Sequence, residues 1–140
     1  MLARQPAASP AVPVALINPD LMTGKRFFWY WFPVLCYAVV IFSFSALPAV
    51  DIKPPFPWSD KTYHFIEYAP FGFLVFRAFV WEKARRILPA LLLAFFVVVL
   101  YALSDETHQL FVPGRQFDFT DMTFDALGGF FGFLPLLWRK

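Results

Sequence analysis

The sequence predicts an all-α fold: a polytopic membrane protein built as a bundle of four transmembrane helices, with both termini in the cytoplasm. Composition is the first observation behind this fold class. Of the 140 residues, 59% are hydrophobic and only 16% are charged, whereas soluble domains are nearer half apolar and about a quarter charged. The second observation is that long apolar runs alternate with polar loops. A domain of this size leaves too much surface in water to hide so many apolar side chains.

We expect a disordered cytoplasmic leader over residues 1–26, which are rich in Pro and Ala and show no apolar period. The apolar run 27–49 follows. It is longer than the ~7 to 15 residues of a signal-peptide core, so we interpret it as a retained spanning helix that ends near Pro48. A cleavable signal sequence is the alternative, because residues 46–49 weakly resemble a cleavage site.

The other three spans are predicted at about 61–81, 87–107 and 119–138, which makes 27–140 one membrane domain. Pro70 lies inside the second span, where we expect a kink. Lys and Arg are concentrated on the side of both termini, so the positive-inside rule places the termini in the cytoplasm. That side carries Arg4, Lys25, Arg26, Arg77, Lys83, Arg85, Arg86, Arg139 and Lys140, and the other side carries Lys53, Lys61 and Arg115.

Two of these spans are too short unless they include charged residues. The acid-free stretch 68–81 covers roughly 21 Å, against ~30 Å of membrane hydrocarbon. The second helix must therefore include His64 and Glu67 in order to cross. The fourth helix must likewise include Asp121 and Asp125. Ionisable groups at that depth need partners or a water-filled cavity.

Helical periodicity of about 100° per residue places these polar side chains on common faces. The face of the fourth helix continues through Gly128 and Gly132, whose spacing lets backbones approach closely, so we expect it to pack on other helices. If the third helix continues past Leu103, three acid-bearing faces can meet at the outer end of the bundle. Their members are Asp60, His64 and Glu67, then Asp105, His108 and Gln109, then Asp118, Asp121 and Asp125.

At the outer end of the predicted bundle, carboxylates outnumber fixed positive charges. Only Lys61 and Arg115 oppose them. So many acids cannot all stay ionised at low dielectric without raised pKa values, a bound cation or open water. The acids are Asp60, Glu67, Asp105, Glu106, Asp118, Asp121 and Asp125.

Four short motifs follow one another along the chain: Ser43-Phe-Ser45-x-x-Pro48, Asp60-Lys61-x-x-His64-x-x-x-Tyr68, Asp105-Glu106-x-x-Gln109-x-x-x-Pro113-x-Arg115 and Asp121-x-x-x-Asp125-x-x-Gly128. In this order and spacing they resemble the VanZ-like family of small bacterial membrane proteins, over about residues 40–132. The resemblance implies a multi-pass protein of the bacterial cytoplasmic (inner) membrane. It also implies a link to teicoplanin resistance, which is associated with the founding member. One position departs from the family pattern, which favours Asn where this chain has Asp125.

We infer a polar, acid-rich site at the outer membrane face that binds or processes a lipid-linked cell-envelope molecule. The candidates for catalysis are Asp60, His64, Asp105, Glu106 and Asp121. The candidates for substrate binding are Lys61, Tyr68, Gln109, Arg115 and Asp125.

Structural roles are the competing interpretation of several of these residues. Asp60 can cap a helix while Lys61 extends to lipid head groups. Arg115 can pair with a carboxylate and lock the loop built by Pro113 and Gly114.

The sequence leaves catalysis open, because no clear nucleophile is present. A non-catalytic binding or shielding protein is the alternative. A small transporter or proton relay is disfavoured, because no inverted repeat is visible. Net charge is +2 and no Walker loop occurs, so we expect a membrane lipid or a lipid-linked precursor as partner and no nucleic acid. A divalent cation is conceivable, but the spacing of its candidate ligands matches no known signature; they are His64, His108, Asp105 and Asp121.

Overall fold

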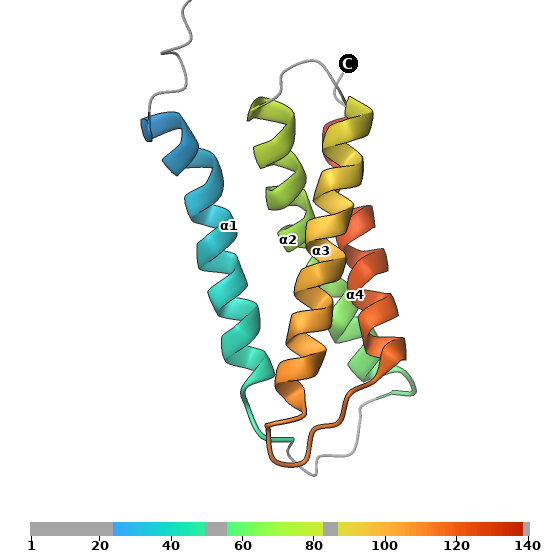
Figure 1. Ribbon diagram of the computed structural model, residues 1–140. Coiled ribbons are helices and arrows are strands. Elements are labelled where there is room, and N and C mark those ends of the chain that lie inside the picture. The colour runs from blue at the N-terminus through green and yellow to red at the C-terminus, as the bar shows by residue number, and fades with distance from the viewer. Residues whose placement is uncertain (1–23, 50–55, 83–86, 139–140) are drawn as a thin grey trace, which may run out of the picture.

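The computed structural model describes residues 24–49, 56–82 and 87–138. It is helical, and no strand occurs in these ranges. The helices are α1 (Gly24–Ser45), α2 (Ser59–Glu82), α3 (Ile87–Gln109), α4 (Phe119–Phe131) and the short α5 (Leu134–Leu137). The four long helices run alternately up and down beside one another, so both ends of the described chain lie at the same end of the bundle (Figure 1). The all-helical prediction is confirmed.

Two predicted boundaries are wrong. Helix α1 begins at Gly24, inside the segment expected to be disordered, and it ends at Ser45 rather than near residue 49; residues 1–23 lie outside the described residues. The early end follows from Pro48, because the residue before a proline is disfavoured in helical geometry and helices stop ahead of it.

The prediction of a single helix over 119–138 is also wrong. Helix α4 stops at Phe131, and α5 starts separately at Leu134. Pro135 explains the break, since it has no N–H to donate to the carbonyl one turn earlier and its ring crowds that carbonyl. Gly132 closes α4 by donating its backbone N–H to the Gly128 carbonyl at 3.0 Å.

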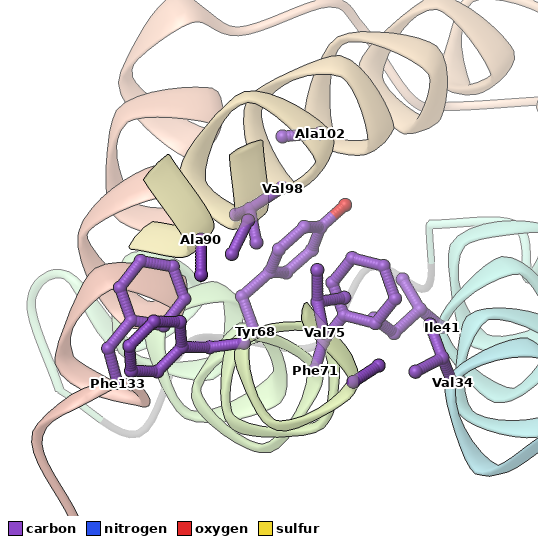
Figure 2. Packing of buried hydrophobic residues seen from close by; sticks show 12 residues of the cluster. Val34, Ile41, Tyr68, Phe71, Val75, Ala90, Val98, Ala102 and Phe133 are labelled. Carbon is purple, nitrogen blue, oxygen red and sulfur yellow. The ribbon is translucent and has the colours of Figure 1, made fainter. Parts of the chain in front are cut away.

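The core forms where α3 presents small side chains to α2. These are spaced by four residues and so share one helical face; they are Ala90, Ala94, Val98 and Ala102, all buried. Tyr68, Phe71 and Val75 of α2 pack against them, and Val34 and Ile41 of α1 complete the cluster from the other side (Figure 2).

Glycines bring α2 and α4 into backbone contact. A Cβ atom added at Gly128 would collide with the carbonyl of Phe65, and one added at Gly132 would collide with the carbonyl of Ala69. Gly72 of α2 has the same relation to the Gly129 backbone. The prediction that Gly128 and Gly132 face another helix is therefore confirmed, and this contact holds the polar N-terminal ends of α2 and α4 side by side.

Within the described ranges, two helices are long and apolar enough to cross a membrane: residues Phe27–Ser45 of α1 and the whole of α3. Helix α2 carries several charged residues, and α4 has only 13 residues. The charges of α2 and the short length of α4 explain why these two helices do not meet the same criterion. Large apolar side chains such as Leu35, Val39 and Phe96 point away from the bundle and are exposed. Exposed apolar surface on this scale is typical of contact with lipid.

Candidate functional site

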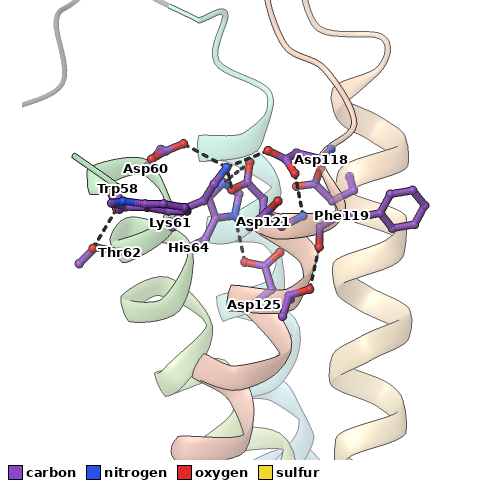
Figure 3. Close-up of polar contacts among 12 residues, drawn as sticks. Trp58, Asp60, Lys61, Thr62, His64, Asp118, Phe119, Asp121 and Asp125 are labelled. Atoms are coloured by element: carbon purple, nitrogen blue, oxygen red, sulfur yellow. Dashed lines mark hydrogen bonds and ion pairs between the residues drawn. The ribbon is translucent and has the colours of Figure 1, made fainter. Parts of the chain in front are cut away.

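The polar candidates gather at one end of the bundle. Because the helices alternate in direction, this end collects the last turns of α1 and α3 and the first turns of α2 and α4. Figure 3 shows side chains of α2 and α4 pointing toward one another there. The predicted meeting of acid-bearing helix faces is thus observed in the described part of the chain.

Lys61 lies at the centre of three carboxylates. Its Nζ is 2.6 Å from Asp121 Oδ1, 2.8 Å from Asp118 Oδ2 and 3.1 Å from Asp60 Oδ2 (Figure 3). The side chain of Lys61 is buried, so it does not extend to lipid head groups. Its ammonium lowers the pKa of Asp118, which precedes α4, to about 2. These three ion pairs surround the Lys61 ammonium, and those to Asp118 and Asp121 join α2 to the start of α4.

His64 joins α2 to α4 one turn deeper. Its Nδ1 lies 2.9 Å from Asp125 Oδ1, and its Nε2 lies 3.8 Å from Asp121 Oδ2. Asp125 is fully buried, and its other oxygen, Oδ2, has no hydrogen-bond partner among the described residues. A short contact between imidazole and carboxylate can orient the ring for proton transfer or for metal binding.

The end of α3 supplies the third side of the site. Glu106 is fully buried and accepts two hydrogen bonds, from the Asp118 backbone N–H at 2.8 Å and from Gln109 Nε2 at 3.3 Å. Asp105 is also buried, with Gln109 Nε2 3.5 Å from its Oδ2. His108, expected on the same face, instead stacks on Phe42 of α1 with ring centroids 4.3 Å apart. The inward face of α3 therefore carries Glu106 in place of His108.

A cavity of about 580 Å³ opens beside these residues, between α1, α2 and α3. The polar residues of its lining include Asp60, His64, Glu67, Asp105, Gln109 and Arg115. The apolar residues of its lining include Val40, Phe44, Leu47 and Ile66. Sequence analysis missed the contribution of α1, because its apolar lining residues show no pattern that separates them from lipid-facing ones.

Tyr68 and Arg115, two candidates for substrate binding, differ in where the structure places them. Tyr68 is fully buried in the core, and its hydroxyl has no hydrogen-bond partner within the described ranges. Arg115 lines the cavity and donates its Nε–H to the Leu47 carbonyl at 3.3 Å. The loop lock expected of Arg115 is therefore made through a backbone carbonyl of the segment after α1, and no carboxylate pairs with it in the described part of the chain.

A possible set of metal ligands also differs from the one considered on sequence grounds. Donor atoms of His64, Glu106 and Asp125 all lie within 4.8 Å of one another. The sequence had suggested His108, Asp105 and Asp121 beside His64. Glu106 and Asp125 replace them because helix rotation turns these two carboxylates, rather than His108, toward the centre.

Comparison with known proteins agrees with the motif order. No curated protein and no solved structure matches the chain. A family model described as VanZ/LLP1 matches residues 19–139, which is most of the sequence and includes every polar residue of the site. The chain therefore belongs to the VanZ/LLP1 family.

Proposed function

We propose that this protein binds a lipid-linked cell-envelope molecule in the cavity between α1, α2 and α3, at the outer face of the bacterial cytoplasmic membrane, and that this binding contributes to teicoplanin resistance. The cavity lining carries the proposal, because it combines charged side chains with apolar ones. An amphiphile with a sugar-phosphate head and a hydrocarbon chain offers the same two kinds of group, and sites for such ligands combine apolar surface with a few polar groups.

The polar lining suits hydroxyl groups and one phosphate. Glu67 and Asp105 offer carboxylate oxygens that accept hydrogen bonds from sugar hydroxyls. Arg115 uses its Nε–H on Leu47, and its other guanidinium donors have the planar geometry that binds phosphate. Val40 and Ile66 provide the wall for the hydrocarbon chain.

A steric substitution in the cavity tests the binding site. In a sensitive Gram-positive host, the wild-type chain is expected to raise the inhibitory concentration of teicoplanin, and Val40→Trp is expected to return it to the empty-vector level by filling the cavity. Val39→Trp is the matched control, because Val39 is the same residue type one position earlier, is 64% exposed and is not part of the lining. Equal protection by both variants, at equal expression, would overturn the proposal.

Binding and catalysis make different demands on Asp105, which is buried beside the cavity. Asp105→Asn keeps the shape of the side chain and removes its charge. If the site catalyses a reaction through this carboxylate, protection is lost completely. If the site binds without turnover, protection falls in graded steps as lining residues are replaced one at a time.

The proposed orientation places the polar end outside and both termini in the cytoplasm, as the distribution of Lys and Arg favours. Green fluorescent protein fused to the C-terminus is therefore expected to fluoresce, and alkaline phosphatase inserted after Gly114 is expected to be active. Gly114 has a positive φ of 78° in the exposed loop between α3 and α4, so an insertion there spares both helices. An inactive phosphatase together with a C-terminal fusion that does not fluoresce would show that the protein has the opposite orientation in the membrane.

A further inference from the structure

We propose that His64, Glu106 and Asp125 bind a divalent metal ion of the first transition row, such as Zn²⁺, where α2, α3 and α4 meet. One ligand comes from each helix, and the three donor atoms lie within 4.8 Å of one another. Glu106 and Asp125 are fully buried, and the His64 side chain is 12% exposed. This inference does not depend on the lipid-linked ligand proposed above.

An unsatisfied carboxylate oxygen supports a metal ion at this place. Asp125 points from α4 toward His64 (Figure 3), and its Oδ1 lies 2.9 Å from His64 Nδ1. Its Oδ2 is buried and has no hydrogen-bond partner among the described residues. A buried carboxylate oxygen without a partner is costly, and a metal ion beside it would remove that cost.

The local charges also favour a divalent cation. Lys61 is occupied by Asp60, Asp118 and Asp121, so it does not neutralise the deeper acids. Glu106 and Asp125 together carry the two negative charges that balance a divalent ion, with His64 coordinating as neutral imidazole. Glu106 is already oriented by hydrogen bonds from Gln109 and the Asp118 backbone, which is the support that metal-ligating carboxylates usually have.

The ligand types select the metal. One imidazole nitrogen with two carboxylate oxygens suits Zn²⁺ and its neighbours, whereas Mg²⁺ and Ca²⁺ prefer oxygen ligands alone. Bonds of about 2.1 Å at tetrahedral angles separate ligands by roughly 3.4 Å, so the three side chains must close around the ion. Three protein ligands leave a coordination position open, and His64 also lines the cavity.

Metal titration of the purified full chain in detergent tests this site. After treatment with a chelator, the wild type is expected to bind one Zn²⁺ per chain, and Co²⁺ in its place is expected to give visible absorption bands. Asp125→Asn and Glu106→Gln should each weaken Zn²⁺ binding at least about tenfold. Thr107→Val is the control, because Thr107 follows Glu106 on α3 but its side chain is exposed, and the affinity of this variant for Zn²⁺ should equal that of the wild type.

Two results would overturn the metal site: a wild-type chain that binds no stoichiometric Zn²⁺, or Asp125→Asn and Glu106→Gln variants that both keep wild-type affinity. Circular dichroism and gel filtration identify any variant that fails to fold. The wild-type stoichiometry decides the question even in that case. Because metal content is measured without antibiotic or lipid, a negative result here is separate from a negative result for the cavity.

Discussion

Gly128→Ala is expected to destabilise the protein by about 2 to 3 kcal/mol, although only one methyl group is added. The new Cβ would collide with the backbone carbonyl of Phe65 on α2. A backbone group cannot rotate away as a flexible side chain can, so α2 and α4 must separate. The separation would also pull apart the polar residues that these two helices hold together.

Gly24→Ala provides the control for this prediction. Nothing lies within 4 Å of a Cβ atom built at Gly24, at the start of α1. In both variants alanine favours the helix intrinsically by up to about 1 kcal/mol, so Gly24→Ala should be neutral or slightly stabilising. The stabilities of the two variants are compared by thermal unfolding in mild detergent. Unfolding is monitored as the loss of the monodisperse gel-filtration peak. A Gly128→Ala variant as stable as Gly24→Ala would mean that the helices do not touch at this point.

The helices could be predicted from the sequence because the signal for each is local. A long apolar run such as 87–107 specifies a helix without knowledge of its neighbours, and α3 follows it closely. The errors occurred where one residue interrupts a continuing apolar pattern. Pro135 divides the run 119–138 while the hydrophobicity continues through it, so hydropathy alone could not locate the break.

The site could be predicted only as far as single helices allow. Periodicity along one helix correctly turned Asp125 inward with Gly128. Which residues meet across helices depends instead on rotation and axial offset, and these are set by contacts such as Gly128 against Phe65. That offset places Asp125, rather than Asp121, within 2.9 Å of His64. No pattern within one segment contains this information.

The position of Lys61 illustrates the same limit and leads to the second large effect. From the sequence, Lys61 was a candidate for substrate binding or for contact with lipid head groups, but its ammonium is buried among carboxylates of α2, α4 and the loop before α4. Lys61→Met keeps the length of the side chain and removes the charge. We expect it to destabilise the protein by about 3 to 5 kcal/mol, the range for removing one partner from a buried ion pair.

Most of this loss should come through Asp121. The side chains of Asp60 and Asp118 are 62% and 40% exposed, so water can solvate them once Lys61 is gone, whereas Asp121 is only 13% exposed. Asp60→Asn alone should therefore change stability by less than about 1 kcal/mol, as exposed ion pairs do. The double variant Lys61→Met with Asp121→Asn should recover a large part of the loss, because it removes the stranded charge as well as its partner. Thermal unfolding of the wild type, Lys61→Met, Asp121→Asn and the double variant in one detergent measures this coupling directly. Additive effects of the two substitutions would show that Lys61 stabilises the bundle through its hydrocarbon stem and not through the Asp121 carboxylate.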